Sequence, residues 1–183
     1  MPFTPYHLGP GLLFKGLAPR HFSWIAFALA QVAVDVEPLL YIFRREPPFH
    51  RELHTLGGAV VAGTAAGLVL LGLRLAGRRF LPAGLPGSSS LPTSLRSELV
   101  SPAAIWIGAL LGGLSHVLLD SLVYPEIRLF WPFSTAAPLF GRLTIEQVTG
   151  LCLAAGLAGL LLVGFRVYWE YRRRRCGPRK ERP

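Results

Sequence analysis

Charged residues are scarce in this sequence: they make up 16% of its 183 residues, whereas hydrophobic residues make up 51%. Soluble domains carry about 25% charged residues, so this composition excludes an ordinary soluble domain. Cysteine is also rare. Cys152 lies within an apolar segment and Cys176 within a basic tail, which excludes a disulfide framework. Lipid must therefore be the solvent for much of the chain.

Several familiar functional signatures are absent as well. The sequence contains neither a Gly-x-Ser-x-Gly nucleophile elbow nor a Walker phosphate loop. Residues 1–17 lack the basic start and the cleavage pattern of a signal peptide, so we expect them to remain on the protein. The formal charge of +9 comes mainly from residues beside the hydrophobic segments and in the tail. We interpret these residues as topology signals and contacts to anionic lipid, and we predict no nucleic-acid partner.

Four apolar segments have the length that a membrane span requires, which is about 20 residues. They occupy residues 22–43, 56–76, 103–123 and 147–168. Residues 81–101 are rich in proline, glycine and serine and predict a flexible linker, and residues 169–183 form a basic tail. We therefore predict an all-α membrane protein, a polytopic bundle of about four transmembrane helices in one domain covering residues 1–183.

Lysine and arginine are distributed unequally between the two sides of this bundle. Fourteen of them fall on the side that carries the 81–101 linker and the C-terminus, and five fall on the other side. Positively charged loops stay in the cytoplasm. We therefore predict a multi-pass protein of the inner (cytoplasmic) membrane whose C-terminus is cytoplasmic.

Ionisable residues inside the predicted spans are the strongest functional signal, because charge is costly at such depth. Asp35 and Glu37 lie in the first span, and His116 and Asp120 lie in the third. At about 1.5 Å per residue, Asp35 and His116 lie about 20 Å above the cytoplasmic ends of their helices, and Asp120 about 25 Å. These residues therefore share one depth near the extracytoplasmic boundary.

Further histidines belong to the same level. His50 and His54 are four residues apart at the entry to the second span, a spacing that would place both imidazoles on one face of a helix. His116 and Asp120 repeat this spacing. With Asp35 and Glu37, three helices then supply three imidazoles and three carboxylates, a set suited to zinc, manganese or iron.

The N-terminal residues could bring His7 to this level too. If residues 8–18 form a half-helix that descends to Pro19 and Arg20, His7 lies about 16 Å above that turn. Residues 1–6 would then be extended near the outer face. We therefore expect residues 1–21 to form a re-entrant hairpin, and we expect His21, at the opposite face, to be interfacial.

These candidates exceed the four ligands of one tetrahedral ion. Two divalent ions, zinc first with manganese or iron as alternatives, are our first choice; one ion with supporting residues is the other. Such ions would activate a water molecule for hydrolysis. In the loop after Asp120, aromatic residues would form an interfacial belt or line a lipid-facing mouth, where Arg128 or Arg142 could bind a substrate phosphate.

The order of motifs is that of a known family. HLGPG, DVEP, HRELHT, SHVLLDSL and LFWPF follow one another along the chain, and this order resembles the YdjM-like family of inner-membrane metal-dependent hydrolases. The resemblance implies a set of metal ligands: His7, Asp35, His50, His54, His116 and Asp120. The family's Asp-x-Asp is here Asp35-Val36-Glu37, and its His-Ser is His54-Thr55. The family is similar in motif order to zinc-dependent phospholipase C, which implies phosphoester chemistry.

The residues and the resemblance together predict a membrane-bound hydrolase of a phosphoester or another lipid-borne bond, with Glu37 bridging ions or acting as general base. Two other functions stay open. A divalent-metal or proton transporter needs polar groups across the membrane, but the first span offers only Gln31 and Ser23 below Asp35. A non-catalytic scaffold, in which histidines and aspartates merely pair, would carry no stoichiometric metal.

Overall fold

The computed structural model describes residues 5–80 and 101–176. The predicted flexible linker at 81–101 therefore lies outside the described residues except for Ser101, and so do residues 1–4 and the end of the basic tail, 177–183. Pro5 and Tyr6, expected to be extended, belong instead to a short 3-10 helix, η1 (Pro5–His7), which leads directly into the first α-helix.

The described residues form helices and no strands. After η1 the elements are α1 (Leu8–Leu17), α2 (Trp24–Arg44), α3 (Leu56–Phe80), α5 (Pro102–Ser121) and α6 (Ile145–Cys176). Four of them, α2, α3, α5 and α6, are long and apolar enough to cross a membrane. The prediction of an all-α protein with four transmembrane helices is confirmed.

Helix ends follow local sequence signals. The hydroxyl of Ser23 accepts a hydrogen bond from Ala26 N at the start of α2, and Ser101 caps α5 through Ala104 N in the same way, each at 3.2 Å. Helix α2 ends where Arg45 takes a left-handed conformation. Helix α6 continues past residue 168 to Cys176, because the arginine-rich run that follows also favours helix.

Helix α5 packs against both α2 and α3 through glycines that bring the backbones together. A Cβ atom on Gly112 would lie 2.5 Å from the carbonyl oxygen of Phe27 in α2, and one on Gly113 would lie 2.4 Å from that of Ala59 in α3. Small residues permit such close approach of helices in lipid. This packing brings the polar side chains at the ends of α2 and α5 together.

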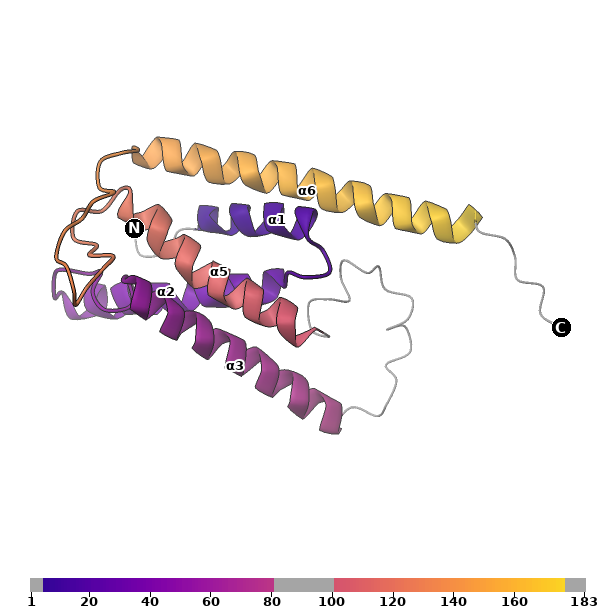
Figure 1. Cartoon of the computed structure of the whole chain (residues 1–183), viewed down its shortest axis with the longest axis horizontal. Coiled ribbons are helices and arrows are strands. Elements are labelled where there is room, and N and C mark those ends of the chain that lie inside the picture. Colours follow the sequence, from indigo (N-terminus) through magenta and orange to yellow (C-terminus); the bar gives the residue numbers. More distant parts are fainter. Residues whose placement is uncertain (1–4, 81–100, 177–183) are drawn as a thin grey trace.

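Helix α1 fills the space between α6 and the other helices (Figure 1). At its end, the buried ammonium group of Lys15 donates hydrogen bonds to the carbonyl oxygens of Pro19 at 3.0 Å and Phe22 at 2.9 Å. These bonds close the turn into α2, so the chain reverses direction as the hairpin prediction requires. The start of α1, which follows His7 directly, therefore lies at the end of the bundle where α2 and α5 finish and where α3 and α6 begin (Figure 1).

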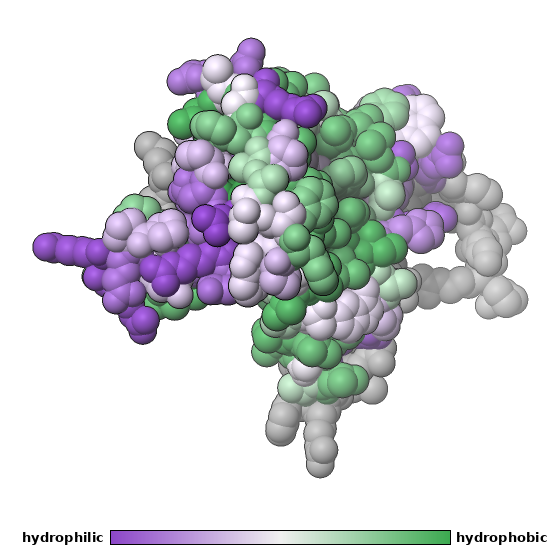
Figure 2. Space-filling model, turned by 60° about the vertical axis from the view of Figure 1, so that its left-hand side comes forward, coloured by the Kyte–Doolittle hydropathy of each residue, from purple (hydrophilic) through white to green (hydrophobic). Residues whose placement is uncertain are grey.

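The outer surface of the helices is largely hydrophobic. Figure 2 shows broad hydrophobic areas interrupted by groups of hydrophilic side chains. On α6, Leu151, Leu157, Leu161 and Phe165 are all more than half exposed, as Leu68 and Leu73 are on α3. Such a surface suits contact with lipid acyl chains, in agreement with the four helices that are long and apolar enough to cross a membrane.

The contact between α1 and α6 yields a test of packing. A Cβ atom on Gly159 would lie 2.3 Å from the carbonyl carbon of Leu12, whereas one on Gly164 would meet nothing within 4 Å. We expect Gly159→Ala to lower the free energy of unfolding by about 1–3 kcal/mol through overpacking. Gly164→Ala should leave it unchanged. Thermal unfolding in detergent, followed by circular dichroism, measures both, and equal midpoints would contradict the α1–α6 contact.

The predicted orientation can be tested with single cysteines in a background that carries Cys152→Ser and Cys176→Ser. Thr135 is exposed in the loop after α5, and His21 is exposed at the opposite end of the bundle. We expect Thr135→Cys to react with a membrane-impermeant maleimide in intact spheroplasts and His21→Cys to react only after lysis, because the excess of basic residues keeps its side cytoplasmic. The reverse pattern would overturn the orientation.

Candidate metal centre

Four ionisable side chains meet at one end of the bundle. Asp35 comes from α2, His54 from the segment before α3, and His116 and Asp120 from α5. One nitrogen or oxygen atom of each lies within 4.8 Å of the others, and all four residues are buried. We call this group the four-residue cluster. It could hold a metal ion.

The distances within the four-residue cluster suit ligands of a common ion. His116 Nε2 lies 3.2 Å from Asp35 Oδ1 and 3.2 Å from Asp120 Oδ2, and His54 Nε2 lies 3.7 Å from Asp120 Oδ2. Ligands at 2.0–2.1 Å from a tetrahedral zinc ion are about 3.3 Å apart. Within the described residues, neither Nε2 atom has a hydrogen-bond partner. Both Nε2 atoms are thus placed where a cation between them and the carboxylates would be bound.

The opposite nitrogen of each imidazole is held by a residue of α2. His116 Nδ1 donates to the amide oxygen of Gln31, and His54 Nδ1 donates to Glu37 Oε2 at 3.0 Å. Both acceptors lack a proton to give, so each Nδ1 carries a hydrogen and each Nε2 faces the carboxylates of the cluster. This is the arrangement in which outer hydrogen bonds orient metal-binding histidines. Burial also lowers the pKa of His54, which keeps its imidazole neutral.

Glu37 lies behind His54 rather than among the four-residue cluster. Besides His54, its carboxylate accepts hydrogen bonds from the backbone N–H groups of Arg51 and Leu53, each at 2.9 Å. Glu37 therefore holds the segment that carries His54, and a role as general base or bridge between ions stays a prediction.

His7 adjoins the four-residue cluster. Its Nε2 lies 3.7 Å from Asp120 Oδ1, and its ring meets that of His116 edge-on with centroids 5.1 Å apart. Its carbonyl oxygen accepts a hydrogen bond of 3.2 Å from the Gln31 amide. Burial lowers the pKa of His7 to about 4, so its imidazole is neutral at physiological pH and able to bind a cation.

His50 lies beside His54, as expected, but outside the four-residue cluster. Helix α3 begins only at Leu56, so the two histidines lie in an irregular segment and the helical spacing does not apply. Their ring centroids are 4.6 Å apart, but His50 Nδ1 donates to Glu126 Oε1 at 2.8 Å and its ring packs on Tyr124. His50 lines a cavity that adjoins the cluster.

Gln31 is the site residue whose role the sequence did not reveal. Its amide joins His116 to the backbone of His7. Asp35 follows four residues later on the same face of α2, as the helical period dictates. The position of Gln31 four residues before an intramembrane carboxylate is the sequence feature that could have indicated its place in the site. Glu126 gave no comparable signal, because loop geometry decides which histidine it meets.

The role of Gln31 can be tested through metal affinity. Gln31→Leu keeps the size of the side chain but leaves His116 Nδ1 without an acceptor, and we expect zinc affinity to fall about 10- to 100-fold. The same substitution at Gln147, exposed at the start of α6, should have no effect. Competition titration with a fluorescent chelator measures both. Unchanged affinity in Gln31→Leu would contradict an orienting role.

No curated protein and no solved structure matches the chain. The family model described as YdjM inner membrane protein matches residues 10–176, which include the whole four-residue cluster and exclude His7. This match confirms the resemblance seen in the motif order and concerns membership rather than activity. The chain belongs to the YdjM inner membrane protein family.

Proposed function

We propose that this protein is a membrane-bound metal-dependent hydrolase that cleaves a phosphoester or another lipid-borne bond. One observation carries the proposal: two imidazoles and two carboxylates face one another at ligand spacing, and the imidazoles are held from behind by Gln31 and Glu37. Both buried Nε2 atoms are directed at these carboxylates, His116 Nε2 at 3.2 Å and His54 Nε2 at 3.7 Å, so a metal ion between them would be coordinated by nitrogen and oxygen together.

The donor set favours zinc, with manganese or iron as alternatives, because it combines imidazole nitrogen with carboxylate oxygen. We assign Asp35, His54, His116 and Asp120 as ligands. Asp120 presents Oδ2 to the two histidines of the cluster and Oδ1 to His7. A carboxylate that faces both sides in this way can bridge two ions, with His7 on the second.

A bound divalent ion would lower the pKa of a coordinated water toward 7 and polarise the bond to be cleaved. The protein's own part is positional. Gln31 and Glu37 keep the Nε2 atoms of His116 and His54 directed inward, and the buried surroundings exclude bulk water. We assign Glu37 to positioning, since its oxygens are engaged by His54 and two backbone N–H groups.

The packing beneath the cluster favours hydrolysis over transport. Phe27 and Ala30 of α2 and Ile105 and Ala109 of α5 are fully buried and apolar. Closely packed side chains of this kind provide neither polar groups nor space for an ion to pass. The donor cluster therefore lies near one membrane face, and these packed residues provide no polar path from it toward the other face.

Metal analysis of detergent-purified protein tests this proposal. We expect one or two equivalents of zinc per chain in the wild type after reconstitution, and a loss of most of it in His54→Ala and Asp120→Asn. His21→Ala and Glu146→Gln remove an exposed histidine and an exposed acid and should retain the metal. Cleavage of a phosphodiester probe in mixed micelles should follow metal content, stop with chelator and return with zinc.

Two results would count against the proposal. A wild type that stays metal-free after reconstitution would overturn the hydrolase function. Full metal content in both His54→Ala and Asp120→Asn would overturn the assignment of ligands, provided that thermal unfolding shows these variants to be folded.

A further inference from the structure

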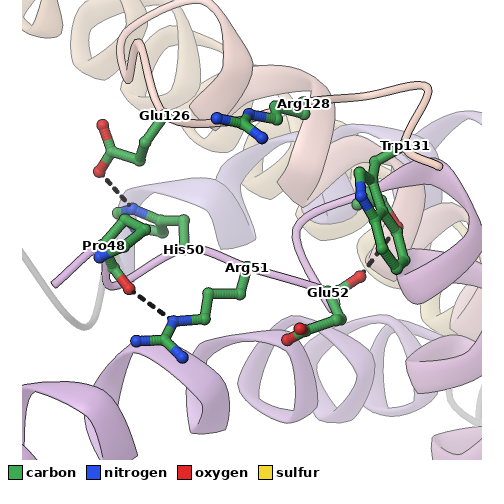
Figure 3. Close-up of a pocket in the computed structure, with 8 residues that line it drawn as sticks. Pro48, His50, Arg51, Glu52, Glu126, Arg128 and Trp131 are labelled. Atoms are coloured by element: carbon green, nitrogen blue, oxygen red, sulfur yellow. Dashed lines mark hydrogen bonds and ion pairs between the residues drawn. The ribbon is translucent and has the colours of Figure 1, made fainter. Parts of the chain in front are cut away.

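A cavity of about 230 Å³ lies between the segment before α3 and the loop after α5. Figure 3 shows Arg51 and Glu52 along one side of it, Arg128 and Glu126 along the other, and Trp131 near one end. We propose that this cavity binds the zwitterionic headgroup of an amine-bearing membrane phospholipid. The inference rests on the proposed function and names the substrate class of that site.

Two of the four charged side chains in the cavity already have partners. The Arg51 guanidinium donates to the carbonyl oxygens of Pro48 at 3.0 Å and Glu46 at 3.2 Å, and it stacks on the Tyr41 ring at 3.8 Å. Glu126 accepts the hydrogen bond from His50. These groups build the wall of the cavity, and their charges are largely satisfied.

The other two charges remain for a ligand. Within the described residues, the Arg128 guanidinium and the Glu52 carboxylate make no hydrogen bond or ion pair, and both residues are exposed. A guanidinium binds a phosphate with two parallel hydrogen bonds. A carboxylate and the face of an indole, here Trp131, both attract an ammonium group. One cation and one anion in the same cavity match a phosphate that carries an amine.

The opposite charges also select against other lipids. A phospholipid with an uncharged alcohol in place of the amine could bind Arg128, but it would leave the Glu52 carboxylate unmatched beside an anionic ligand. The cavity has two arginines and two glutamates, so its formal charge does not attract simple anions strongly. The pattern therefore favours a zwitterion over inorganic phosphate.

The position of the cavity indicates a lipid. The ring of His50 lines the cavity and lies against the ring of His54, a member of the four-residue cluster. A headgroup in the cavity would therefore adjoin the proposed reaction centre. The same loop exposes Phe130, Phe133 and Phe140, and Phe133 is 95% exposed. Exposed aromatic side chains gather at the level of lipid headgroups.

Calorimetric binding to the full chain in detergent, stripped of metal to prevent turnover, tests the inference. The probes are dihexanoyl-phosphatidylethanolamine, dihexanoyl-phosphatidylglycerol and free O-phosphoethanolamine. We expect the wild type to bind the ethanolamine lipid about tenfold more tightly than the glycerol lipid. Glu52→Gln should abolish this preference by weakening the ethanolamine lipid alone, and Arg128→Gln should weaken both lipids about tenfold.

Matched controls come from the same two segments. Glu46→Gln and Arg142→Gln change exposed residues that do not line the cavity, and both should behave as the wild type. Equal binding of the two lipids by the wild type, or an undiminished preference in Glu52→Gln, would overturn the inference. If free O-phosphoethanolamine binds as tightly as its lipid, the ligand is soluble and the lipid assignment is wrong.

The outcome separates this inference from the proposed hydrolase. Lipid selectivity that depends on Glu52, in a protein that never takes up zinc, would support the headgroup site and overturn the metal-dependent reaction. A protein that binds zinc but does not distinguish the lipids would support the metal-dependent reaction and overturn the headgroup site.

Discussion

Burying two carboxylates and two imidazoles in a bundle that lipid surrounds is costly unless each has a partner. Helix α2 supplies these partners from three of its residues. Gln31 supports His116 from behind, Asp35 enters the four-residue cluster, and Glu37 supports His54. The site therefore depends on α2 more than on any other helix, and the glycines of α5 matter because they let the two helices come close enough for these contacts.

Much of the fold was readable from the sequence because membranes impose simple rules. Span length follows from bilayer thickness, and depth follows from helical rise. For that reason the apolar segments mark the four long helices, and the depth estimate places Asp35 and Asp120 at one level, where the structure brings them together. His116 and Asp120 lie on one face of α5, as their four-residue spacing predicts, because α5 is a regular helix through both residues.

The irregular segments were harder to read for an equally physical reason. His50 and His54 have helical spacing, but α3 starts after them, and hydrogen bonds from Glu37 to the backbone determine how the segment runs. Such contacts join residues far apart in the sequence and leave no periodic signal. The division of the six expected ligands into four that converge, His7 beside them and His50 turned toward Glu126, could not be foreseen from spacing alone.

The three hydrogen bonds that Glu37 accepts have a mechanical consequence. Its carboxylate ties the backbone at residues 51 and 53 and the side chain of His54 to the same point on α2. Arg51 and Glu52 line the cavity from this tethered stretch, while His54 faces Asp120 from it. These bonds restrain the stretch against α2, so a headgroup bound in the cavity would lie at a distance from the donor atoms that the hydrogen bonds of Glu37 help to fix.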